Sequence, residues 1–222
     1  MGAAQRIKIV IYDCDGVLFD SRGANEAFYN HILTHFNMPA MNLKQLEFVH
    51  SSTAREALDF LFQASPLREE AQKYRYEVDY SQFVYLMKPE PYLREVLQRL
   101  HPTYRTAIAT NRGHTTPLVL QNHNLGGLFD MVVTSMDVTE SKPHPESIWK
   151  ILHNFKLEPG EALYVGDSVV DETVCQRAGV SFAAYKNPTL KANHHLQNHY
   201  DLLGILGIDT EEESQDNISS HY

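Results

Sequence analysis

Short runs of apolar residues, rich in β-branched and aromatic side chains, recur along the chain, and each ends in a polar cluster. Their length and composition are typical of buried β-strands. Five runs predict strands over residues 7–12, 106–110, 131–135, 162–166 and 181–185. Amphipathic segments follow the later runs and predict helices over residues 115–123, 145–155 and 171–178. Strands that alternate with helices pair in parallel, so this pattern predicts a doubly wound α/β core.

The stretch 21–87 breaks this rhythm, because its apolar residues follow helical spacing and it contains no convincing strand. It predicts three helices, over residues 26–36, 52–62 and 69–85. Pro89 and Pro91 mark the return to the alternating pattern. We therefore predict a core of residues 1–20 and 88–209 and a small α-helical cap, residues 21–87, inserted after the first strand. The acidic, polar tail, residues 210–222, is predicted to be disordered.

Composition narrows the class of protein. Hydrophobic residues make up 43% and charged residues 21% of the 222 residues, as in an ordinary globular protein. The net charge of −9 disfavours binding to a nucleic-acid backbone, although one metal ion or lysine can still attract a small anion. The N-terminus lacks a signal-peptide pattern, and no apolar run reaches the ~18 residues that a membrane-spanning helix requires. We therefore expect a cytoplasmic protein that binds neither nucleic acid nor membrane.

Reactive and charged side chains follow the predicted strands in four clusters. In chain order, the clusters are Asp13 with Asp15, Thr110 with Asn111, Lys142 alone, and Asp167 with Asp171. Each cluster alone has an ordinary explanation, such as an Asp-Gly turn, a polar turn, a solvated lysine or an acidic helix start. Together they are more specific, because the carboxyl ends of parallel strands meet at one edge of a sheet, where α/β proteins bind ligands.

With these four clusters, the sequence resembles the phosphatase branch of the haloacid dehalogenase-like superfamily. The resemblance spans residues 7–184 and includes the DGVLFDS form of the first motif and the KPHPE form of the third. In these forms it is similar to phosphoglycolate phosphatases and β-phosphoglucomutases, whose cap is inserted at the same place. The resemblance implies a Rossmann-like core and Mg²⁺-dependent hydrolysis of a small phosphorylated metabolite. Dehalogenases of the superfamily lack an acid two residues after the nucleophile, whereas this chain has Asp15.

The resemblance assigns a role to each motif residue. Asp13 would attack phosphorus and form an aspartyl-phosphate, and Asp15 would protonate the leaving oxygen and then activate water. The metal site is implied to contain Asp13, the backbone carbonyl of Asp15, and Asp167, with Asp171 ordering metal-bound water or a lysine. The residues implied to hold the other phosphate oxygens are Thr110, Asn111 and Lys142.

Several residues outside the motifs allow two interpretations, one functional and one structural. Arg55, in HSSTAREAL, is similar to a cap arginine that contacts phosphate in the phosphoglucomutases, but a solvated arginine fits as well. Arg112 and His114 follow the second motif and either reach the substrate or are ordinary loop residues. The histidines at positions 194, 195 and 199 resemble a metal cluster only superficially, and a polar loop entering the last helix is the preferred interpretation.

Two other functions compete with a phosphatase on the same fold. A phosphomutase would share the first half-reaction, but the histidine that those enzymes carry after the first motif is absent from SRGANEAF. A weakly catalytic regulatory protein would have no chemical need for two acids and a metal site. Metal-dependent turnover distinguishes these functions. The sequence does not name the substrate, since specificity lies in the cap loops, and we expect a monomer or a homodimer.

Overall fold

The computed structural model describes residues 6–208. At its centre lies a six-stranded sheet with the order β5-β4-β1-β6-β7-β8, in which all neighbouring strands are parallel. Its strands are β1 (Ile9–Tyr12), β4 (Arg105–Ala109), β5 (Met131–Val133), β6 (Ala162–Gly166), β7 (Ser181–Tyr185) and β8 (His194–Leu196). The predicted doubly wound parallel sheet is confirmed, and its five predicted strands are all present.

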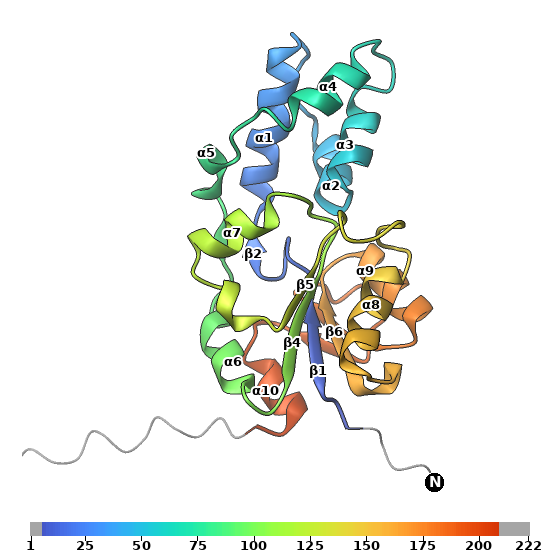
Figure 1. The fold of residues 1–222 in the computed structure, drawn as a ribbon. Helices are drawn as coiled ribbons and strands as arrows, with labels where there is room; N and C mark the ends of the chain where they lie inside the picture. Colours follow the sequence, from blue (N-terminus) through green and yellow to red (C-terminus); the bar gives the residue numbers. More distant parts are fainter. Residues whose placement is uncertain (1–5, 209–222) are drawn as a thin grey trace, which may run out of the picture.

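Helices cover both faces of the sheet (Figure 1). One face carries α6 (Leu93–Leu100), α7 (Thr116–Asn122) and α10 (Asp201–Leu206), and the other carries α8 (Glu146–Phe155) and α9 (Val169–Ala178). Two 3₁₀ turns, Gly126–Leu128 and Pro159–Glu161, precede β5 and β6. In β1, Val10 and Tyr12 pack toward the first face, and Ile9 and Ile11 toward the second. This burial on both sides explains the continuous apolar run of β1 in the sequence.

A helical insertion lies between two very short strands, β2 (Phe19–Asp20) and β3 (Lys88–Pro89). Its helices are α1 (Arg22–His35), α2 (Leu43–Ser51), α3 (Ala54–Leu61), α4 (Arg68–Tyr74) and α5 (Ser81–Val84). Helices α1 to α4 gather beyond one end of the sheet (Figure 1). Strands β2 and β3 are antiparallel, with Asp20 opposite Lys88, so the chain leaves and re-enters the core side by side. The behaviour of residues 21–87 as a separate domain stays a prediction.

The insertion differs from the predicted helices in two places. Helix α2 is not predicted by the apolar pattern, yet Asn42 and Gln45 form a reciprocal capping box at its start. That spacing is a helix-start signal readable in the sequence. The single helix predicted over 69–85 is wrong, because the structure has α4 and α5 there. Asp79 accepts hydrogen bonds from the amide and the hydroxyl of Ser81, which starts a new turn at that point.

The region predicted as a polar loop before the last helix contains strand β8. His194 and His195 belong to this strand, whose pairing with β7 provides the hydrogen bonds that a three-residue polar segment cannot supply alone. His199 is buried, donates to the Val17 carbonyl from Nε2 at 2.8 Å and stacks on Tyr185. Burial lowers the pKa of His199 to about 4, which fits a neutral core histidine.

Two further expectations concern the ends of the chain and membranes. The predicted disordered tail, residues 210–222, lies outside the described residues, as does residue 209 of the predicted core. Within residues 6–208, no helix combines the length and the apolar character needed to cross a bilayer.

Candidate active site

Strand β1 carries Asp13 to one end of the sheet. The Asp13 amide donates to the Val165 carbonyl of β6 at 2.9 Å, which continues the parallel ladder beyond the strand. Gly16 follows with a φ of 79°, a left-handed conformation that suits glycine. A Cβ atom at Gly16 would collide with the carboxylate of Asp167. The turn after β1 therefore needs glycine both for its backbone and for the close approach of a second carboxylate.

In the part of the chain that the structure describes, Lys142 is one of two buried cations in the site. Its Nζ lies 3.0 Å from Asp13 Oδ1 and 2.7 Å from Asp171 Oδ1, and it donates to the Tyr164 hydroxyl at 2.8 Å. Burial opposes the charge, but the two carboxylates outweigh it and raise the pKa of Lys142 above its usual value. The ammonium group therefore stays protonated beside the candidate nucleophile, Asp13.

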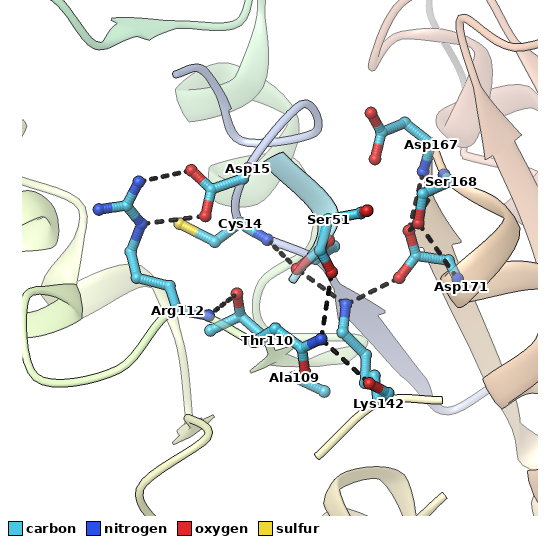
Figure 2. Close-up of polar contacts among 12 residues, drawn as sticks. Cys14, Asp15, Ser51, Ala109, Thr110, Arg112, Lys142, Asp167, Ser168 and Asp171 are labelled. Atoms are coloured by element: carbon cyan, nitrogen blue, oxygen red, sulfur yellow. Dashed lines mark hydrogen bonds and ion pairs between the residues drawn. The ribbon is translucent and has the colours of Figure 1, made fainter. Parts of the chain in front are cut away.

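Asp167 and Asp171 follow β6 but have different surroundings. Asp171 is fully buried; its Oδ1 accepts from Lys142, and its Oδ2 accepts from the hydroxyl and the amide of Ser168. Ser168 is the N-cap of α9, so the start of this helix fixes the Asp171 carboxylate. Among residues 6–208, no group forms a hydrogen bond or ion pair with the Asp167 carboxylate (Figure 2). The Asp171 carboxylate is therefore held by Lys142 and Ser168, whereas the Asp167 carboxylate has free lone pairs.

Three carboxylates form a candidate cation site. Oxygens of Asp13, Asp167 and Asp171 lie within 4.8 Å of one another. Burial and repulsion between these groups raise the pKa of Asp13 to about 7 and that of Asp167 to about 8. A hard divalent cation such as Mg²⁺ would relieve this repulsion and takes carboxylate ligands. Because both oxygens of Asp171 already accept hydrogen bonds, Asp13 and Asp167 fit the ligand role best.

Asp15 is bound by Arg112, which lies in the loop after β4. Arg112 Nε donates to Asp15 Oδ2 at 3.0 Å, and Nη2 donates to Oδ1 at 2.5 Å. Burial opposes ionisation of Asp15, but the guanidinium outweighs burial and lowers the pKa of Asp15. The pair lies on the opposite side of the site from Asp167 (Figure 2). The sequence left the role of Arg112 open, since nothing in TNRGH indicates a partner so far along the chain.

The polar residues after β4 join the core to the insertion. Thr110 is buried, and its hydroxyl accepts from the Arg112 amide at 3.1 Å. Asn111 Nδ2 donates to the carbonyls of Lys142 at 3.1 Å and Ser51 at 3.3 Å. Ser51 ends α2, so Asn111 connects the third motif with the insertion. The side-chain nitrogen of Asn111 therefore donates its hydrogen bonds to backbone carbonyls.

One cavity between the sheet and the insertion gathers the predicted residues. The core contributes Asp13, Asp15, Thr110, Asn111, Lys142 and Asp167 to its wall. The insertion contributes Asn25, His50, Ser51 and Tyr80, among others. All four clusters recognised in the sequence therefore meet at the same end of the sheet.

Comparison with known proteins identifies the family. A model of the haloacid dehalogenase-like hydrolases matches residues 10–185, which is most of the chain. The chain belongs to this family. Pyrophosphatase PpaX of Anoxybacillus flavithermus is 27% identical to this haloacid dehalogenase-like hydrolase over 225 residues, covering 91% of this chain and 98% of the relative.

Solved structures agree with this assignment. A HAD-superfamily hydrolase, subfamily IA, variant 1, from Geobacter sulfurreducens is 40% identical, with a TM-score of 0.74, covering 90% of this chain and 97% of that one. β-Phosphoglucomutase of Clostridium difficile shares the fold at 16% identity, with a TM-score of 0.76 and coverage of 88% and 93%. The predicted family and the class of phosphoric ester hydrolase are confirmed, while the roles of individual site residues stay predictions.

The sequence of this haloacid dehalogenase-like hydrolase left the roles of three residues undecided, namely Arg55, Arg112 and His114. Arg55 is exposed and lines a separate pocket with Asp59 and Glu69, so the structure does not bring it to the cavity. Arg112 and His114 do line the cavity. The arginine from the core, rather than the one from the insertion, is therefore the one that the fold places beside the carboxylates.

The raised pKa values predict how this haloacid dehalogenase-like hydrolase responds to pH. Its affinity for Mg²⁺ should increase from about pH 6 to about pH 9, because protons on Asp13 and Asp167, with pKa values of about 7 and 8, compete with the metal. Folding raises both pKa values from the usual aspartate value of 3.8, so the metal-free protein should lose stability as the pH rises from about 4 to about 8, and the loss should level off at higher pH. Calorimetric titration at several pH values measures the affinity, and Asp167→Asn should lose the pH dependence at the upper end of this range while it keeps the part that comes from Asp13. An affinity that is constant over this range would contradict the assignment.

Proposed function

We propose that this hydrolase is a Mg²⁺-dependent phosphatase that releases phosphate from a small phosphorylated metabolite through an aspartyl-phosphate on Asp13. The contact of 3.0 Å between Lys142 and Asp13 supports this proposal most directly. Lys142 and the Cys14 amide both contact Oδ1 of Asp13, so the carboxylate is fixed in orientation at the wall of the cavity. A fixed carboxylate beside a permanent cation suits nucleophilic attack on an anionic phosphoryl group.

In the first half-reaction, a carboxylate oxygen of Asp13 bonds to phosphorus, and the bond from phosphorus to the leaving oxygen breaks. Away from Arg112, burial raises the pKa of Asp15, so that this carboxyl group can carry the proton that it gives to the leaving oxygen. The Lys142 ammonium and the Thr110 hydroxyl hold the remaining phosphoryl oxygens, over which the negative charge is spread. Mg²⁺ held by Asp13 and Asp167 would supply further positive charge for these oxygens.

In the second half-reaction, Asp15 takes a proton from a water molecule whose oxygen attacks the phosphorus. The bond between Asp13 and phosphorus then breaks, which releases inorganic phosphate and restores the carboxylate. Because Asp15 has given up its proton in the first half-reaction, it is a carboxylate at this stage, as a general base must be. Binding of a small metabolite, rather than nucleic acid, agrees with the net charge of −9. A monomer or homodimer and a cytoplasmic location stay predictions.

The direct test measures phosphate release from p-nitrophenyl phosphate and a panel of phosphorylated metabolites, with Mg²⁺ and with a chelator. We expect the chelator to lower the rate at least ~100-fold and added Mg²⁺ to restore it. The best member of the panel then indicates the substrate class. Full activity in the chelator would exclude Mg²⁺. Binding of Mg²⁺ without release from any compound would favour phosphoryl transfer or a regulatory role instead.

A further inference from the structure

Arg112 is buried in the wall of the cavity, and all five N–H groups of its guanidinium have partners. Nε and Nη2 bind the Asp15 carboxylate. Nη1 donates to the hydroxyls of Tyr80 at 2.9 Å and Thr115 at 3.1 Å, and Nη2 donates to Asn25 Oδ1 at 3.2 Å. The guanidinium is therefore held in one position by both the core and the insertion.

These partners are of two kinds. Tyr80, Thr115 and Asn25 are neutral, so they orient the guanidinium without balancing its charge. Within residues 6–208, Asp15 is the carboxylate that forms an ion pair with Arg112. A buried guanidinium without an anionic partner is strongly unfavourable. Anything that draws Asp15 away from Arg112 must therefore be accompanied by another anion.

The proposed reaction draws Asp15 away. In the structure the Asp15 carboxylate is turned toward Arg112, on the side opposite Lys142 and Asp167 (Figure 2). In-line attack by Asp13 places the leaving oxygen across the phosphorus from Asp13, within the cavity, whereas both carboxylate oxygens of Asp15 accept hydrogen bonds from Arg112. To reach the leaving oxygen, Asp15 must give up at least one of its two hydrogen bonds with Arg112, and an N–H group in the cavity then needs a new acceptor.

We propose that the Arg112 guanidinium is a subsite for a second anionic group of the substrate, which replaces the Asp15 carboxylate there. This inference rests on the proposed function and narrows its substrate class to phosphate esters or anhydrides that carry a further carboxylate or phosphate near the scissile bond. The flat, two-pronged guanidinium matches the oxygens of either group. Occupation of the subsite releases Asp15 toward the leaving oxygen, so recognition of the acidic group and catalysis are linked.

The test compares the binding of three non-hydrolysable compounds by calorimetry in excess Mg²⁺. Phosphonoacetate carries a carboxylate, methylenediphosphonate carries a second phosphonate, and ethylphosphonate carries no second acidic group. We expect the wild-type protein to bind at least one of the doubly acidic compounds about ten- to hundredfold more tightly than ethylphosphonate. The compound that binds more tightly distinguishes a carboxylate from a phosphate subsite.

Arg112→Gln should remove this preference, whereas Arg68→Gln, which removes an exposed guanidinium from the insertion, should keep it. Equal wild-type affinity for all three compounds, or a preference that persists in Arg112→Gln, would overturn the inference. If circular dichroism shows that Arg112→Gln does not fold, Tyr80→Phe provides a second test. It removes one anchor of the guanidinium and should reduce the preference several-fold, and an undiminished preference would again overturn the inference.

Binding is measured here without turnover, so the two proposals fail separately. If no compound in the panel releases phosphate, the proposed phosphatase function is contradicted, but the proposed subsite is not. Loss of the preference for acidic compounds, with phosphate release intact, counts against the subsite alone.

Discussion

Asp13→Asn should lower the rate of phosphate release by about 10⁴-fold or more, because an amide cannot form the aspartyl-phosphate. Asparagine has nearly the same shape and can still accept hydrogen bonds from Lys142 and the Cys14 amide at Oδ1. We therefore expect the far-UV circular dichroism and the chain's compactness to stay unchanged. The measurement is kcat with Mg²⁺ on the best compound of the panel.

Asp79→Asn is the matched control for this variant. Asp79 is an exposed carboxylate of the insertion that binds Ser81, so the same chemical change occurs away from the cavity. This variant should retain most of the wild-type rate. If Asp13→Asn also retained it, Asp13 would not be the nucleophile, and the aspartyl-phosphate mechanism would be abandoned.

Lys142→Met should both abolish turnover and destabilise the fold, by about 3–5 kcal/mol. The substitution leaves Asp13 and Asp171 buried close together without the cation that each contacts. Methionine fills a similar volume, so lost charge rather than lost packing dominates the effect. Urea denaturation in the absence of metal measures the change in the free energy of unfolding.

A surface lysine and a second substitution make this test specific. Lys150→Met removes an exposed ammonium group that binds the Asp137 carbonyl, and it should cost less than about 1 kcal/mol. Adding Asp171→Asn to Lys142→Met should recover part of the lost stability, since it removes one of the uncompensated charges. A loss below about 1 kcal/mol for Lys142→Met would show that this lysine does not balance the buried carboxylates.

The sheet and the core of the site could be predicted because both depend on local sequence. A strand buried on both faces, such as β1, has a continuous apolar run, and the sheet topology places the residue after each strand at the same edge. The meeting of Asp13, Lys142 and Asp167 follows from that rule and from the motif spacing. No side-chain detail was needed to bring these groups together.

The cavity wall on the side of the insertion could not be predicted in the same way. Arg112 and Asp15 are 97 residues apart, and their pairing depends on how the loop after β4 meets the helices. Tyr80 and Asn25, which orient Arg112, follow no motif and read as ordinary helix residues. The sequence resemblance pointed to Arg55, an arginine of the insertion. The residues around Arg55 do not indicate whether α3 directs this side chain toward the cavity or away from it.

The antiparallel pair formed by β2 and β3 has an evolutionary consequence. Asp20 and Lys88 lie opposite each other, at a separation that a two-residue turn spans in an ordinary hairpin. The whole segment between them can therefore be shortened, lengthened or exchanged in the course of descent without changing the order of any strand in the sheet. Selection can rebuild the side of the cavity that the insertion forms while Asp13 and Lys142 keep their positions, so the proposed reaction can be adapted to many metabolites.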